Sequence, residues 1–251
     1  MSNLTRLTLK HTQITGTIPN SIGNLENLLT IEISDNSFSG SFPASIGNLT
    51  HLIYIMLDHN GFGGTLPTTL GKLTNLTFIQ IDNNNFNGSV PKEIQNLSQL
   101  RIFTADSNKF NGCYSLFNIP MLDSLSLAFN NLIGTIPSLG NLTKLNKLVL
   151  AYNSHLSGTI PDDLGQLGYL QHLELSNCNI SGTIPESIGN LTSISSIFLQ
   201  SNQLSGTIPE TFISLKQLLS NLDLSNNQLS GTIPSFFVNF SGNINFNNNN
   251  F

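Results

Sequence analysis

The sequence of 251 residues predicts a solenoid, in which a short unit repeats along the chain and stacked parallel strands share one core. The first observation is an internal repeat: segment 204–209 reads LSGTIP and recurs, with one Ile-for-Leu change, at 156–161, 180–185 and 229–234. The second is its period, because the proline of this segment returns every 24 residues over most of the chain. The third is composition: 9% charged and 39% hydrophobic residues can form a core, which argues against disorder.

Each position of the repeat has a structural role, and one unit can be written LxxLxLxxNxLSGTIPxxIGNLxx. The LxL section alternates with period 2 and is typical of a short strand. We expect its leucines, such as Leu219, Leu222 and Leu224, to point into a core shared with neighbouring coils. The following glycine permits a tight turn, and the proline fixes φ and ends strand pairing.

An asparagine follows the strand in almost every unit. We expect its buried amide to satisfy backbone groups at the turn and to bond to the next coil. Thr12 and Cys178 interrupt the file. The file consists of Asn36, Asn60, Asn84, Asn108, Asn130, Asn153, Asn202, Asn227 and Asn249.

The repeats predict a single domain over 1–251, and three of them depart from the consensus. Repeat five lacks its Ile-Pro and is two residues short, repeat six is one short, and repeat seven has an extra residue at Ser154-His155. We expect local irregularity there, and no capping segment at either end. The repeats are 4–27, 28–51, 52–75, 76–99, 100–121, 122–144, 145–169, 170–193, 194–218 and 219–242, followed by a truncated repeat at 243–251.

The repeat resembles the leucine-rich repeat family, specifically its 24-residue plant-type subclass with the SGxIP segment. The resemblance covers nearly the whole chain. It implies a right-handed curved solenoid with a concave parallel sheet, short second strands and 3₁₀ turns on the convex side. It also implies a receptor-like or inhibitor-type ectodomain: an extracellular or cell-surface module, signalling with a co-receptor or secreted as a glycoprotein.

The outward positions of the predicted strands contain the candidate binding site. Four apolar side chains fall on adjacent coils, which often marks a binding surface. Aspartates recur beside them about 5 Å apart, a repulsion that a basic group on a protein or peptide ligand would relieve. Solvated aspartates and a bound calcium are the alternatives, although no oxygen-rich loop encloses a cation. The candidate residues are Tyr54, Met56, Asp58, His59, Phe78, Gln80, Asp82, Ile102, Thr104 and Asp106, with Glu32 and Asp35 nearby.

Several classes of function are disfavoured. The acid–imidazole neighbours on these files are Asp58 with His59 and His172 with Glu174, and no nucleophile is placed against them, so we expect no enzyme activity, cofactor or metal. Nine scattered basic residues and a net charge of −5 argue against nucleic acid. No apolar run could span a membrane, and the amino terminus does not read as a signal peptide.

A rival function lies in the SGT segments. Ser and Thr two residues apart share one side of a short strand, and stacking would align them into two hydroxyl files on a flat, uncharged surface. Such files resemble the ice-binding surfaces of some antifreeze solenoids. The alternative residues are Ser157, Thr159, Ser181, Thr183, Ser205, Thr207, Ser230 and Thr232.

Glycosylation motifs recur in the Gly-Asn-Leu-Thr string, at Asn48, Asn141 and Asn190. We expect these asparagines on the convex side, where a glycan would leave the binding face open.

Overall fold

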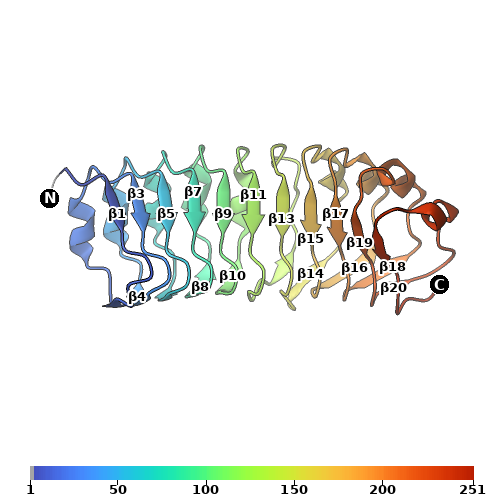
Figure 1. The fold of residues 1–251 in the computed structure, drawn as a ribbon, viewed down its shortest axis with the longest axis horizontal. Coiled ribbons are helices and arrows are strands. Elements are labelled where there is room, and N and C mark those ends of the chain that lie inside the picture. The colour runs from blue at the N-terminus through green and yellow to red at the C-terminus, as the bar shows by residue number, and fades with distance from the viewer. Residues whose placement is uncertain (1–2) are drawn as a thin grey trace. The chain divides into compact units, whose positions relative to one another are not determined.

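The structure is a computed structural model that describes residues 3–251. The chain forms two compact units, Met1–Asn130 and Asn131–Phe251. In each unit a short strand, a turn, a second short strand and a 3₁₀ helix or turn make one coil, and the coils repeat along the chain (Figure 1). The repeat solenoid predicted from the 24-residue period is therefore confirmed, while the single-domain division stays a prediction.

The first strands of the coils pair in parallel and in chain order. Pairing keeps the 24-residue register, as in Tyr54 with Phe78, so equivalent positions of successive repeats stand side by side. The strands of the first unit are β1 (Arg6–Thr8), β3 (Thr30–Glu32), β5 (Tyr54–Met56), β7 (Phe78–Gln80), β9 (Ile102–Thr104) and β11 (Ser124–Ser126). Those of the second are β13 (Lys147–Val149), β15 (His172–Glu174), β17 (Ser196–Phe198), β19 (Asn221–Asp223) and β21 (Asn243–Asn245).

The SGT segments form the expected second strands, which give one five-stranded parallel sheet per unit. The first contains β2 (Thr15–Gly16), β4 (Ser37–Ser41), β6 (Gly61–Gly64), β8 (Asn85–Ser89) and β10 (Lys109–Gly112). The second contains β12 (Gly134–Thr135), β14 (Leu156–Gly158), β16 (Asn179–Thr183), β18 (Gln203–Gly206) and β20 (Gln228–Leu229).

A 3₁₀ helix usually follows the proline of the repeat, because proline fixes φ and needs no hydrogen-bond acceptor at a helix start. Pro43, for example, has φ −72° immediately before η2. The helices are η1 (Asn20–Asn24), η2 (Ala44–Asn48), η3 (Thr68–Lys72), η4 (Lys92–Asn96), η5 (Tyr114–Asn118), η6 (Asp162–Gln166), η7 (Glu186–Asn190), η8 (Glu210–Leu215) and η9 (Ser235–Asn239).

The repeated asparagines tie each coil to its neighbour. Asn84 donates from Nδ2 to the carbonyls of Ile81 and Asp82 in its own turn and of Leu57 one coil earlier. Its Oδ1 accepts the N–H of Phe62, also one coil earlier, at 3.0 Å. The predicted role of the amide is confirmed, but the bond runs to the preceding coil rather than the next.

The core of the first unit contains a stack of four phenylalanines. Successive rings of Phe38, Phe62, Phe86 and Phe110 lie 5.9–6.2 Å apart with interplanar angles of 7–15°. From Leu132 to Leu229, leucine or isoleucine occupies the same repeat position in the second unit, as in Leu204, which is fully buried. The predicted core leucines Leu219, Leu222 and Leu224 are buried as well.

The irregular repeats differ from the others where the sequence predicts. In repeat five, the pairing of β8 with β10 shifts register between Phe110 and Gly112. Repeat six forms turns where other repeats form a 3₁₀ helix. There the carboxylate of Asp163 accepts hydrogen bonds from the N–H groups of Leu139 and Gly140 and from the Ser138 hydroxyl, which satisfies the turn.

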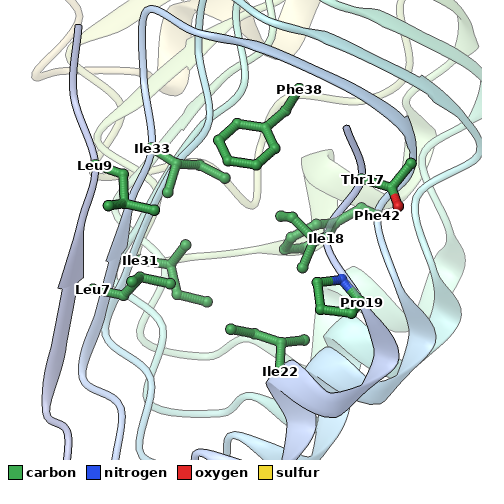
Figure 2. Close-up of a pocket in the computed structure, with 10 residues that line it drawn as sticks. All are labelled: Leu7, Leu9, Thr17, Ile18, Pro19, Ile22, Ile31, Ile33, Phe38 and Phe42. Atoms are coloured by element: carbon green, nitrogen blue, oxygen red, sulfur yellow. The ribbon is translucent and has the colours of Figure 1, made fainter. Parts of the chain in front are cut away.

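The first coil leaves an apolar cavity of about 120 Å³ between its two strands. Figure 2 shows Leu7 and Leu9 facing Ile18 and Ile22 across it. Leu7, Leu9 and Ile18 are half-buried, whereas Ile31 and Ile33 of the second coil are almost fully buried. Within residues 3–251, the inward side chains of this coil are therefore covered by a neighbouring coil on one side only.

Both cysteines are free thiols. Burial raises the pKa of Cys113 to about 12 and that of Cys178 to about 11. Cys178 occupies an asparagine position and donates its thiol to the carbonyls of Leu150 and Ser176. Over residues 3–251, no helix has the length and apolar character needed to cross a membrane.

Candidate ligand-binding face

The outward positions of β1 to β11 form one surface, called the sheet face below. In β5, Ile55 points inward and is 1% exposed, while Tyr54 and Met56 on either side point outward. This alternation follows from the strand period of two. Because pairing is in register, the outward residues of neighbouring strands form rows, and all ten predicted binding residues lie in or beside these rows.

The four apolar residues predicted as anchors are brought together. Tyr54 pairs with Phe78 and Phe78 with Ile102 along one row, and Met56 lies in the neighbouring row opposite Gln80. The rings of Tyr54 and Phe78 are 6.3 Å apart at 50°, a tilted contact favourable for aromatic pairs. Tyr54 is 42% exposed and the other three are half-buried, so the cluster is open to a ligand.

The three aspartates also lie on successive coils, but neighbouring donors already satisfy them. Ser34 donates to Asp58 at 2.6 Å, and Thr104 donates to Asp82 at 2.7 Å. The Asp106 N–H also donates to Asp82, at 2.6 Å. Hydrogen bonds within the protein therefore relieve part of the repulsion that the spacing predicts.

Asp106 is held in the same way by the strand that follows it. The Ser126 hydroxyl lies 2.7 and 2.9 Å from its two carboxylate oxygens, and the Ala128 N–H lies 2.7 Å from Oδ1. Burial raises the pKa of Asp82 despite the bonds from Thr104 and Asp106, and the neighbouring carboxylates Asp106 and Asp58 add to the rise. The row is thus a partly buried, hydrogen-bonded strip.

Histidines and acids gather at the edge of this strip, where the backbone turns with positive φ. His59 Nδ1 lies 3.1 Å from Asp58 Oδ2 and 3.8 Å from Asp35 Oδ1, and His11 Nδ1 lies 3.4 Å from the other Asp35 oxygen. Asp35 is 39% exposed, so its carboxylate is the more accessible one for a basic ligand group. No group of three metal-ligating side chains suited to an ion occurs within residues 3–251.

Glu32 belongs to the same surface but is already paired. Arg6 lies 3.0 Å from one carboxylate oxygen and Lys10 contacts the other. The hydrogen bond from Lys10, opposed by burial and reinforced by Arg6, holds the pKa of Glu32 below its usual range. Glu32 is therefore a structural anion in this coil, which its sequence position does not reveal.

The predicted hydroxyl files of the second unit are present, but they run at an angle to the direction in which the coils stack. The pairing places Thr183 opposite Ser205, not opposite Thr207, so each file shifts by two residues from coil to coil. Ser181 donates to the Gly158 carbonyl at 3.3 Å, so this hydroxyl is engaged within the protein. Ser157, Ser205 and Ser230 bond in the same way to the preceding coil, and Thr159, Thr183, Thr207 and Thr232 are exposed.

The three glycosylation candidates are exposed and lie away from the sheet strands. Asn48 is the last residue of η2 and Asn190 the last of η7, while Asn141 lies in the turn of repeat six. Because Asn48 lies outside β1 to β11, a glycan there would leave the sheet strands of the first unit uncovered.

The sequence predicts Thr104 as a binding residue, but it did not reveal that Ser34, Thr104 and Ser126 are the donors that hold the aspartates. A signal is present in hindsight, because Thr104 and Ser126 each lie 20 or 22 residues after the aspartate that they bond. A hydroxyl one coil along, at the outward strand position, can thus reach back to the carboxylate.

Comparisons with known proteins support the geometry. A family model described as "Leucine-rich repeat region" matches residues 1–126, and the "Leucine Rich Repeat" model matches 169–191, 193–215 and 218–240. A search of curated protein sequences finds no match.

Two solved structures of plant receptors are similar over nearly the whole chain. The plant peptide hormone receptor RGFR1, in complex with RGF2, is 32% identical with a TM-score of 0.91, covering 99% of this chain and 44% of the receptor chain. The Arabidopsis receptor kinase HAESA, in complex with the peptide hormone IDA and the co-receptor SERK1, is 32% identical with a TM-score of 0.91, covering 98% and 41%. The chain therefore spans less than half the length of these receptor chains.

A plant ice-binding protein is also similar, at 24% identity and a TM-score of 0.76, over 91% of this chain and 74% of that protein. At that identity the likeness concerns the fold alone. The repeat, the stacked parallel strands and the two family models agree, and the chain belongs to the plant-type leucine-rich repeat family.

Proposed function

We propose that the chain is a non-enzymatic binding module that recognises a peptide on the sheet face of Met1–Asn130. RGFR1 and HAESA were each solved with a peptide ligand, and these receptors have the same fold at 32% identity. By the same likeness, we place the module outside the cell, in a receptor ectodomain or a secreted inhibitor. A co-receptor is a further expected partner, since the HAESA complex contains one.

The observation that carries the proposal is the apolar cluster of Tyr54, Met56, Phe78 and Ile102. Outward strand positions in this protein are mostly polar, and apolar side chains exposed together on adjacent strands favour a partner. Aromatic residues are also the side chains that most often dominate binding energy at interfaces.

Asp35 and the aspartate strip define the second part of the ligand. Because donors within the protein hold Asp58, Asp82 and Asp106, these carboxylates contribute a negative potential more than free hydrogen-bond acceptors. Asp35, which is more exposed, is the expected contact for a Lys or Arg side chain. The ligand is therefore a peptide with a basic residue next to an apolar one.

Panning a displayed library of random dodecapeptides against the protein tests this proposal. Selected peptides should pair a basic with an apolar residue, and Tyr54→Ala or Phe78→Ala should weaken their binding about tenfold. Ile213→Ala is the matched control, because Ile213 is 58% exposed but lies in η8, away from the strands. Peptides that bind all three variants equally would place the site elsewhere.

Ice binding by the second unit is the alternative, favoured by the four exposed threonines at equivalent positions. Two features oppose it: the files are oblique, and hollows of about 540 Å³ beside Thr159 and Thr183 are lined by Asp162 and Glu186. Ice-growth inhibition by the protein, abolished in Thr183→Tyr, would support the alternative. Absence of ice-growth inhibition in the parent protein would refute the alternative.

A further inference from the structure

A second candidate site lies on the outward side of β15 to β21 in the second unit, away from the residues proposed above. The register sets Glu174, Phe198, Asp223 and Asn245 side by side in one row. His172, Ser196, Asn221 and Asn243 form the neighbouring row. We call these eight residues the amide grid, and we propose that it binds a neutral oligosaccharide.

The grid has one aromatic ring surrounded by polar groups. Phe198 is half-buried, and its ring lies 5.6 Å from the imidazole of His172. Beside it is a hollow of about 120 Å³, lined by Asp223 and the three asparagines together with the apolar side chains of Phe198, Leu222 and Ile244. A sugar ring presents an apolar C–H side and a rim of hydroxyls, so it fits a ring with amides around it.

The asparagines keep hydrogen-bonding capacity for a ligand. Asn243 donates to Asn221 at 3.0 Å, Asn221 donates to Ser196 at 3.3 Å, and Asn245 donates to Asp223 at 3.2 Å. Each side-chain amide has two N–H donors and an oxygen that can accept twice, and these bonds use only part of that capacity. The bonds also hold the amides in place, which lowers the entropy lost on binding.

The charges of the grid favour a neutral ligand over an anionic one. Glu174 is paired with His172 at 3.3 Å, and this contact, opposed by burial and aided by nearby Lys147, lowers the pKa of Glu174. Asp223 accepts from the Ser225 N–H and hydroxyl and from Asn245. Both carboxylates are therefore hydrogen-bonded within the protein, yet they can still accept hydroxyl donors, and their negative charge repels an anionic sugar.

Saturation-transfer NMR on the whole chain tests the proposal. The probes are cellohexaose, xylohexaose and mannohexaose, with trigalacturonic acid as the anionic comparison. We expect transfer to at least one neutral hexasaccharide and none to trigalacturonic acid. Transfer to none of the three neutral sugars would overturn the proposal, as would binding of hexalysine that is lost in Phe198→Ala, because it would assign the grid to a basic peptide.

Four variants locate the binding. Phe198→Ala and Asn221→Ala should each weaken it about tenfold or more, while Phe78→Ala, on the first unit, should leave it unchanged. Phe198→Tyr keeps the ring and should bind like the parent, which separates loss of the contact from loss of fold when circular dichroism is unchanged. Binding that survives Phe198→Ala, or that is lost in a folded Phe198→Tyr, would contradict the proposal.

Discussion

Replacing one of the asparagines that follow the strand of each repeat should destabilise the first unit, because one backbone N–H loses its acceptor. In Asn84→Cys, the carbonyls that the amide contacts keep other donors. Asn60 bonds to Leu57, Asn108 bonds to Ile81, and the N–H of His59 bonds to Asp82. The buried N–H of Phe62 loses the Asn84 oxygen, and we expect this to cost about 1–3 kcal/mol. Asn and Cys are close in size, so little cavity is added.

The reciprocal change, Cys178→Asn, should gain almost nothing. The equivalent N–H of the preceding coil belongs to Leu156, and it already donates to the Asn153 carbonyl at 2.9 Å. The extra residue of repeat seven lies between these two, so the looser turn supplies an acceptor that other coils lack. An added amide at position 178 would then contribute less than about 0.5 kcal/mol.

Urea unfolding measures both changes, with hydrogen exchange at the Phe62 amide as the local readout, since repeat proteins open coil by coil. Asn87→Ala, at an exposed asparagine, is the control. If Cys178→Asn stabilised the protein as much as Asn84→Cys destabilised it, or if Phe62 exchanged no faster in Asn84→Cys, the account of the unsatisfied N–H would be refuted.

Three further results are expected. Gly182→Ala should lower the free energy of unfolding by more than about 1 kcal/mol, because Gly182 has φ +78° and an added Cβ would lie 2.8 Å from Thr159 Cγ2. Gly168→Ala is the control and should change thermal unfolding little, because its Cβ would lie 3.8 Å from Thr192 Oγ1, an ordinary contact distance. Glu32 and Asp82 should change the pH dependence of the free energy of unfolding in opposite directions. Urea unfolding of the parent, Glu32→Gln and Asp82→Asn at several pH values measures both effects. Because the pKa of Glu32 is lowered, Glu32 stabilises the protein at pH values above the usual glutamate pKa, and this stabilisation is lost as the pH falls. Because the pKa of Asp82 is raised, Asp82 lowers the stability as the pH rises through the acid range. Cys113, with a pKa near 12, should resist iodoacetamide at pH 8 until urea is added, and rapid labelling of the native protein would contradict its burial.

The repeat made most of the fold predictable. A 24-residue period with alternating leucines specifies strands that stack in register, and the structure confirms strands, second strands and 3₁₀ helices at the expected places. The phenylalanine stack was not predicted, although Phe38, Phe62, Phe86 and Phe110 recur at one consensus position. What the repeat could not specify was pairing between the second strands. Their offset of two residues depends on how each turn enters the strand, so the hydroxyl files run obliquely.

The aspartate strip shows why a site is harder to predict than a fold in a repeat protein. Spacing placed Asp58, Asp82 and Asp106 on adjacent coils and implied repulsion, and the structure agrees on the placement. Whether such a row attracts a partner depends on the donors around it, and those come from other coils: Ser34 from the coil before Asp58, and Ser126 from the coil after Asp106. The same reasoning separates the two surfaces proposed here. On the sheet face, donors within the protein hold the carboxylates while apolar side chains are exposed, so the apolar cluster must supply most of the affinity for a ligand. On the amide grid, amides around one aromatic ring keep unused hydrogen-bonding capacity, so a ligand with hydroxyl groups is the better match.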